Sequence, residues 1–297
     1  MISDIRKLAI GFLLATSAFS SEIEDRVHTT INAITGSDIH LSHEKRDFDV
    51  LTIKNSYRQT FVKEKFFLIQ GGLHGDEKLT SDFVLWLAKR MKENKSLLNQ
   101  LPNNVVVDFL PYANPDNYQK HRYNANNVNL NRNFAVFWGI STEPNGHKPF
   151  SEPETKAIQS LMQSRQYISA IDVHGYVPWI VAPSPPKHFS SAPPLQKLKY
   201  NLWYEALKKG MSMLKGYELQ NARDLGDGGS FEDWAFWTNN TLSLCLEMSH
   251  SQRLVHYPNQ PVIDTYHSYE KYIYHMFKSA LSIKKQIENK SIIANNP

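Results

Sequence analysis

Gln70-Gly71-Gly72-Leu73-His74-Gly75-Asp76-Glu77 is the stretch that decides the fold. It follows an apolar run at 66–69 that predicts a buried strand, and it precedes residues 78–92, whose apolar spacing predicts a helix. His74 and Glu77 therefore lie at a strand-to-helix turn, where glycines permit a tight backbone path. On such a turn an imidazole and a carboxylate three residues apart can point the same way and form half of a zinc site. The plain alternative is a helix-start glutamate beside a surface histidine, so the sequence downstream has to decide.

Outward from this turn, predicted strands alternate with predicted helices. Further strands are expected at 47–53, 105–110, 167–173 and 241–246, and further helices at 23–34, 151–164, 195–214, 231–237 and 263–287. Ser151 is expected to be the N-cap of its helix, because Pro and Glu follow it in the first turn. The alternation predicts an α/β fold, a single-domain α/β/α sandwich with a mixed, mostly parallel central sheet.

Two more polar residues stand just past predicted strands. His174 follows the strand at 167–173, and Glu247 follows the strand at 241–246. In such sheets, sites gather at the strand ends and the adjoining loops. Two histidines and one glutamate with an open position form a known catalytic zinc set, which needs a second carboxylate as general base. Glu247 is the candidate for that base.

The segment from Arg122 to Phe134 is rich in asparagine and has few regular patterns, which predicts a long ordered loop. An arginine from this loop would be able to stabilise an oxyanion. Another arginine, together with an asparagine, would be able to hold a substrate carboxylate through a forked contact.

Composition excludes several classes of protein. The chain has 297 residues, 41% hydrophobic and 21% charged, which fits an ordinary globular protein. The net charge of +4 is spread along the chain, without a Lys/Arg block or a basic stripe with interleaved aromatics, so nucleic acid is not an expected partner. Cys245 is the only cysteine, which excludes an intramolecular disulfide and a cysteine zinc site and indicates a buried packing thiol.

The N-terminus has the pattern of a signal peptide. Arg6 and Lys7 precede the apolar run 8–19, and Ala18-Phe19-Ser20 fits a small-x-small cleavage site. The run is short for a membrane span, and a buried N-terminal helix or an uncleaved anchor are the alternatives. We expect a signal peptide at 1–20, a catalytic domain at 21–297, no stable membrane span after cleavage, and an exported protein that is periplasmic or secreted.

Several ordered motifs carry a family resemblance: His74-Gly75-Asp76-Glu77, Asn114-Pro115-Asp116, Arg122 through Phe134, Ser151-Glu152-Pro153-Glu154-Thr155, Asp172-Val173-His174 and Leu246-Glu247-Met248. Together they resemble the motifs of the zinc carboxypeptidases of the funnelin type, and they span most of the chain after the signal peptide. The Ser-Glu-Pro-Glu-Thr segment is typical of bacterial members, most like the murein peptide amidases and D,L-carboxypeptidases.

The resemblance implies roles for the strand-end residues. His74, Glu77 and His174 would bind one Zn²⁺ per chain. Glu247 would activate the water and pass its proton to the leaving amine.

The resemblance also implies roles for the loop. Arg122 would stabilise the oxyanion, and Asn131 and Arg132 would hold the substrate carboxylate. Three positions depart from the family pattern. Asn117 replaces a glycine, Asn129 replaces an aspartate whose charge would orient the loop, and no capping tyrosine precedes the turn at 228–230.

The leading hypothesis is an exported zinc peptidase that acts on peptidoglycan stem peptides. The alternatives are a general carboxypeptidase on protein C-termini, an N-acyl amino acid deacylase, and a non-enzymatic binding protein on an inactive scaffold. Asp224, Asp227, Glu232 and Asp233 fit either the wall of a pocket for a cationic group or a solvated helix start. The oligomeric state is not determined by the sequence.

Overall fold

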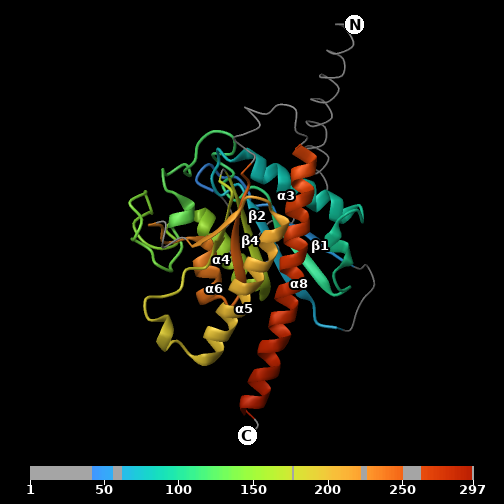
Figure 1. The fold of residues 1–297 in the computed structure, drawn as a ribbon. Coiled ribbons are helices and arrows are strands. Elements are labelled where there is room, and N and C mark those ends of the chain that lie inside the picture. The colour runs from blue at the N-terminus through green and yellow to red at the C-terminus, as the bar shows by residue number, and fades with distance from the viewer. Residues whose placement is uncertain (1–41, 56–61, 176, 222–225, 250–261, 296–297) are drawn as a thin grey trace, which may run out of the picture.

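A seven-stranded sheet runs through the computed structural model, which describes residues 42–55, 62–175, 177–221, 226–249 and 262–295 (Figure 1). Its strands, in spatial order, are β1 (Leu51–Lys54), β3 (Val105–Leu110), β2 (Lys65–Gly71), β4 (Tyr167–His174), β7 (Leu242–Glu247), β5 (Trp179–Ala182) and β6 (Glu218–Asn221). The central strands β3, β2, β4 and β7 are parallel, β1 and β5 pair antiparallel with β3 and β7, and β6 is parallel to β5. The prediction of a mixed, mostly parallel sheet is confirmed.

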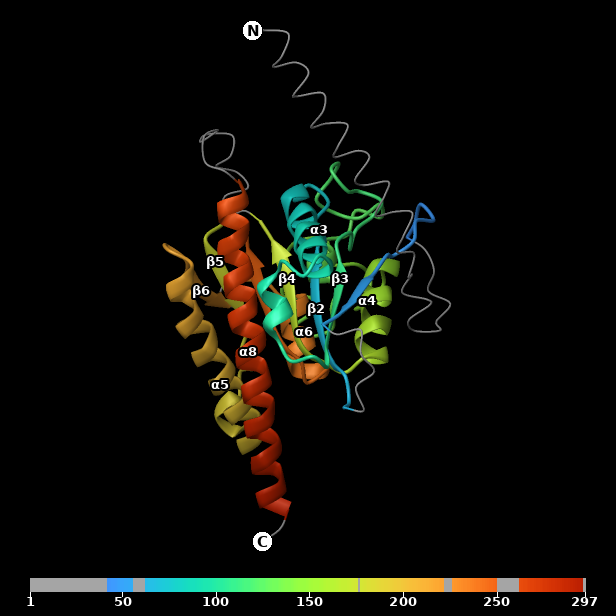
Figure 2. The ribbon, with the colours of Figure 1, turned by 90° about the vertical axis from the view of Figure 1, so that its right-hand side faces the viewer.

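Helices cover both faces of this sheet (Figure 2). The helices α3 (Lys78–Lys92), α5 (Pro194–Gly210) and α8 (Val262–Asn295) pack on one face, and α4 (Pro153–Ser164) and α6 (Phe231–Thr238) on the other. Side chains alternate along the strands: Phe67 and Ile69 of β2 belong to the first core, and Leu68 belongs to the second. The α/β/α sandwich expected from the sequence is therefore confirmed.

Some elements differ from the prediction. Strands β5 and β6 were not expected, since each has only four residues and β6 is polar. Helix α4 begins at Pro153 with Glu152 as its N-cap, because the hydroxyl of Ser151 donates to Glu152 Oε1 at 2.6 Å instead of capping the helix. Helix α8 continues to Asn295, past the expected end at 287. The remaining short helices are η1 (Leu97–Gln100), η2 (Leu130–Arg132), η3 (Phe189–Ser191) and η4 (Met211–Met213).

The signal peptide at 1–20 and the helix expected at 23–34 lie outside the described residues. Among the helices that the structure describes, none combines the length and the apolar character that a membrane crossing requires.

The start of α4 holds a buried pair of carboxylates. The amide of Asn124 donates to Glu152 Oε2 at 2.8 Å and to Glu154 Oε2 at 3.1 Å. The other oxygen of Glu154, Oε1, has no hydrogen-bond partner among the described residues. Burial is the main cause that raises the pKa of Glu154 to about 7, and the negative charge of Glu152 acts in the same direction.

We expect Glu154→Gln to stabilise the protein in alkaline solution. The ordinary pKa of a glutamate is 4.5, and the pKa of Glu154 in the folded protein is about 7. Between these two pH values the folded wild type holds a proton that the unfolded chain has released, so the unfolding free energy falls as the pH rises. Glutamine stays neutral, so the variant should gain about 1–3 kcal/mol of unfolding free energy over wild type above this window.

Urea unfolding at about pH 5 and about pH 8 measures this difference. The exposed Glu218→Gln is the control and should change neither value. An equal stability difference between Glu154→Gln and wild type at both pH values would contradict the assignment.

Candidate active site

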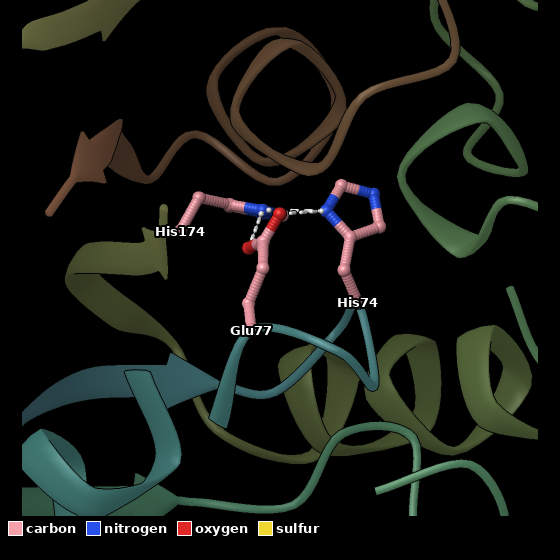
Figure 3. Close-up of side chains that lie close together, drawn as sticks. All are labelled: His74, Glu77 and His174. Atoms are coloured by element: carbon pink, nitrogen blue, oxygen red, sulfur yellow. Dashed lines mark hydrogen bonds and ion pairs between the residues drawn. The ribbon is translucent and has the colours of Figure 1, made fainter. Parts of the chain in front are cut away.

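His74, Glu77 and His174 meet at the carboxyl ends of β2 and β4 (Figure 3). The carboxylate of Glu77 lies between the two rings, with Oε1 2.9 Å from His74 Nδ1 and Oε2 3.2 Å from His174 Nδ1. The two Nδ1 atoms are 3.1 Å apart. All three side chains are buried, so three donor atoms converge on one point away from bulk water.

Two glycines hold the turn in this path. Gly72 has a positive φ of 70°, and a Cβ there would lie 2.9 Å from the carbonyl oxygen of Pro111. A Cβ on Gly75 would lie 2.1 Å from the carbonyl oxygen of Asn117. The turn is therefore packed against the Asn-Pro-Asp segment at a distance that only glycine permits, which is why His74 is held in place.

The other ring nitrogen of each histidine has an acceptor. His74 Nε2 lies 3.0 Å from Asn129 Oδ1, and His174 Nε2 lies 2.8 Å from Asp172 Oδ2. Acceptors at Nε2 favour a proton on that atom and leave the Nδ1 lone pairs for a shared ligand. Asn129 Oδ1 also accepts from the backbone N–H of Asn131 at 2.9 Å, so this residue orients the loop without the charge of the family aspartate.

Charge and burial act in different proportions on the three residues. Burial lowers the pKa of His74, and Glu77 offsets only part of that effect. For His174, Asp172 and Glu77 outweigh the effect of burial and raise the pKa well above its usual value. For Glu77, the two imidazoles outweigh burial and hold the pKa of the carboxyl below its usual range.

This donor set fits a zinc ion. Four ligand atoms, one of them open to water or substrate, are usual for catalytic zinc, and His74, Glu77 and His174 each offer one atom within 4.8 Å of the others. A second cluster of His43, Glu152 and Glu154 has the same spacing, but the Asn124 amide donates to both of its carboxylates, so a hydrogen-bond donor already serves these oxygens.

Glu247 is the last residue of β7, and in the parallel register it stands opposite His174. Burial is the main cause that raises the pKa of its carboxyl to about 7. Its Oε2 atom has no hydrogen-bond partner among the described residues. The structure thus places a second carboxylate, with one oxygen available, beside the zinc-type group.

Arg122 contacts this group directly, with its Nη1 atom 3.0 Å from Glu77 Oε1. Its side chain is 34% exposed, so the guanidinium can reach a ligand that enters from solvent. The structure brings together all the sequence-predicted residues named so far.

Asn131 and Arg132 extend the site along the loop. The Asn131 amide nitrogen is 3.4 Å from His174 Nε2, and its Oδ1 accepts from the backbone N–H of Phe231 at 2.9 Å. Arg132, expected to be a simple carboxylate binder, is already paired: its Nη2 lies 2.7 Å from Asp227 Oδ1 and its Nε lies 3.4 Å from Glu143 Oε2.

Sequence reasoning missed Glu143 altogether. Its carboxylate accepts from the Asn129 amide in addition to its contact with Arg132, and no local pattern points to it. Of the four acidic candidates for a pocket wall, Asp227 lies at Arg132, Glu232 and Asp233 are buried, and Asp224 is outside the described residues. The burial of Glu232 and Asp233 rules out a solvated helix start. Cys245 is buried as expected.

Residues 22–284 match the sequence profile of the family described as zinc carboxypeptidase. The chain belongs to the zinc carboxypeptidase family. The resemblance found in the motifs is thereby confirmed, and this family consists of hydrolases.

Curated relatives in the zinc carboxypeptidase family share a minority of their residues with this chain. Carboxypeptidase SOL1 of Arabidopsis thaliana is 28% identical over 200 residues, which cover 63% of this chain and 40% of that protein. Carboxypeptidase D of Homo sapiens is 29% identical over 147 residues, which cover 45% of this chain and 10% of that protein. The matches thus span less than half the length of these two relatives.

Solved structures of zinc carboxypeptidases share the fold. Thrombin activatable fibrinolysis inhibitor aligns with a TM-score of 0.62 at 19% identity, over 86% of this chain and 72% of that one. Carboxypeptidase A from Helicoverpa armigera aligns with a TM-score of 0.58 at 20% identity, over 84% of this chain and 67% of that one. At these identities the likeness supports the fold alone.

Proposed function

We propose that the chain is a zinc-dependent metallopeptidase that hydrolyses an amide bond near the C-terminus of a peptide. The observation that carries this proposal is the position of Glu247, a buried carboxylate with an available oxygen, opposite His174 in the register of β4 and β7. Burying a carboxylate oxygen without a hydrogen-bond partner destabilises the folded protein. Its presence beside a complete ligand set therefore favours a catalytic role for Glu247 over an inactive scaffold.

His74, Glu77 and His174 would hold one Zn²⁺, which would supply Lewis acidity to the scissile carbonyl and lower the pKa of water. Glu247 takes a proton from the attacking water and gives it to the leaving amine, and a pKa raised toward neutrality suits both steps. Because its position beside Glu77 leaves it partly exposed, Arg122 can donate to the developing oxyanion.

Asn131 and Arg132 hold a carboxylate of the departing residue. The backbone N–H of Phe231 donates to the side-chain oxygen of Asn131 and fixes this part of the loop to the start of α6, so Arg132 is held on a rigid support. A bound carboxylate at this position orients the neighbouring amide bond toward Glu247.

For the substrate, we propose a peptidoglycan stem peptide, in the manner of a murein peptide amidase or D,L-carboxypeptidase. The support is the resemblance of residues 151–155 to bacterial members, together with the proposed signal peptide at 1–20 and mature catalytic domain at 21–297. Such a protein would act outside the cytoplasm, in the periplasm or after secretion.

A general carboxypeptidase on protein C-termini is the second candidate. The names of the curated relatives, including carboxypeptidases D and O, favour it. An N-acyl amino acid deacylase and a non-catalytic binder have no comparable support from the geometry.

The test is mass spectrometry of purified muropeptides after incubation with the zinc-loaded protein, beside a control with chelator. We expect a chelator-sensitive loss of a terminal residue or of the diamino acid portion. Intact muropeptides would remove this substrate class, and the same assay on ordinary peptides and on N-acyl amino acids would then separate the other activities. If every substrate stayed intact, the proposed peptidase function would be wrong.

A further inference from the structure

Three lysines form a line along the outer side of α8. Lys271, Lys278 and Lys285 are exposed and follow one another at intervals of seven residues. Seven residues make about two turns of an α-helix, so the three side chains point the same way at intervals of about 10 Å. In the part of the chain that the structure describes, none of the three pairs with a carboxylate. Because of this spacing the line is not visible as a lysine block in the sequence.

The acids of α5 and α8 do not offset this charge. Among the side chains described on these two helices, Glu205 already pairs with a lysine of α5 at 3.3 Å, and Glu270 is buried beside Arg90. Glu288 is the one other acid, and it lies three residues past Lys285, which places it off the line of lysines. The outer side of α8 therefore carries positive charge without compensation.

Helix α5 lies beside α8 and adds to this charge (Figures 1 and 2). A Cβ on Gly210 would lie 2.7 Å from Tyr272 Cε2, so the C-terminal end of α5 packs closely on α8. At this contact, burial lowers the pKa of His275, and the positive charges of Lys209 and Lys278 act in the same direction. Lys209 is exposed, so it supplies a fourth cation next to the line on α8.

The side of α5 that carries Lys209 also carries apolar side chains. Leu195 and Leu202 precede Lys209 at intervals of seven residues, so the three lie on one side of the helix. Leu195 is 42% exposed and is one of four exposed large hydrophobic residues among those that the structure describes. A soluble polyanion offers no apolar partner to this leucine, whereas the interfacial region of a bilayer does.

This surface is separate from the candidate active site. Helices α5 and α8 pack on one face of the sheet, and the loop of the site is fixed to α4 and α6 on the other face through Asn124 and Asn131. A partner bound to α5 and α8 therefore needs none of the residues assigned to zinc or to proton transfer.

We propose that the α5/α8 surface, formed by Leu195, Lys209, Lys271, Lys278 and Lys285, binds an anionic phospholipid bilayer. The lysines contact lipid phosphates, and the leucine enters the interfacial region. A flat bilayer meets all four cations at once, because they lie along two adjoining helices. The inference goes beyond the proposed peptidase function and does not depend on it.

Co-sedimentation of the full chain with lipid vesicles tests the proposal. One set of vesicles is phosphatidylcholine, and the other is an equimolar mixture with phosphatidylglycerol. At low salt we expect wild type to prefer the anionic vesicles by at least about a hundredfold in partition coefficient, and high salt should reduce this preference. In the triple variant Lys271→Gln, Lys278→Gln, Lys285→Gln the preference should fall to within about tenfold, since each lysine near such a surface is worth about fivefold.

The matched control removes the same charge elsewhere. Lys54→Gln, Lys63→Gln, Lys95→Gln changes three exposed lysines outside α5 and α8 and should keep the wild-type preference. Residues 1–41 are the same in every variant, so any lipid binding by that segment is common to all of them. Circular dichroism verifies that each variant is folded.

Leu195→Ser separates a bilayer from a soluble polyanion. The variant should bind anionic vesicles about tenfold more weakly, because less apolar surface is buried, and should bind inorganic polyphosphate as wild type does. Equal binding of wild type to both kinds of vesicle, or an unchanged preference in the triple variant of α8, would overturn the proposal. An unchanged affinity of Leu195→Ser for vesicles would also overturn it. Lysine-dependent binding to polyphosphate alone would identify a soluble polyanion as the partner instead.

Discussion

Glu247→Gln is expected to keep its zinc and lose turnover. The substitution preserves the size of the side chain but removes the group that takes a proton from water and returns it to the leaving amine. General acid–base groups typically contribute about 10²–10⁴-fold to rate, so kcat should fall by about a thousandfold. KM should change little, because Glu247 lies at the reacting atoms and not at the carboxylate site of Arg132.

Steady-state kinetics on the cleaved peptide, beside the zinc content of each preparation, measure this effect. In wild type, the rate should rise with pH as the Glu247 carboxyl loses its proton, and a bound cation should shift this limb below the value of about 7, because nearby positive charge favours the carboxylate. The exposed Glu218→Gln provides the matched control. Turnover at the wild-type rate in Glu247→Gln would show that the assigned mechanism is wrong.

His74→Ala should abolish tight zinc binding. The variant loses one of three converging donor atoms. Loss of a residue that only hydrogen-bonds to a metal ligand typically lowers metal affinity about 10–100-fold, so loss of a ligand itself should lower zinc affinity by at least about a thousandfold. Glu77, the charged partner of His74, keeps its contacts with His174 and Arg122, so the variant leaves no buried charge unpaired at this position.

Chelator competition gives the dissociation constant, and thermal unfolding gives a readout independent of activity. Excess zinc should raise the Tm of wild type, because a ligand that binds only the folded state stabilises it, and should leave the Tm of His74→Ala unchanged. His188→Ala, which removes an exposed histidine, should behave as wild type. An unchanged zinc affinity in His74→Ala would remove this residue from the ligand set.

The parts of the fold that the sequence predicts well are those with strong local patterns. The strand at 105–110 and the helix at 78–92 have the expected bounds, since an apolar run and an amphipathic repeat determine them. Strands β5 and β6 have four residues each and pair with distant parts of the chain, so their formation depends on the sheet that receives them.

The candidate site likewise has residues that the sequence predicts and contacts that it does not predict. His74, His174 and Glu247 could be found because each follows a predicted strand, and parallel strands bring their carboxyl ends to one edge. The ion pairs of Arg132 with Glu143 and Asp227 join separate loops, and the local sequence around either acid does not predict them. The prediction that Ser151 caps its helix was wrong, because its hydroxyl donates to the carboxylate of the adjacent Glu152.

The distribution of the zinc-type ligands along the chain bears on how the protein is made. Glu77 and His174 are separated by 97 residues, and they meet because β2 pairs directly with β4. A nascent chain that ends before β4 holds only the turn at 74–77, and the proposed proton-transfer residue arrives later still, at the end of β7. Under the proposed function, the site is therefore incomplete in such a nascent chain. Its residues come together only once β2, β4 and β7 have paired.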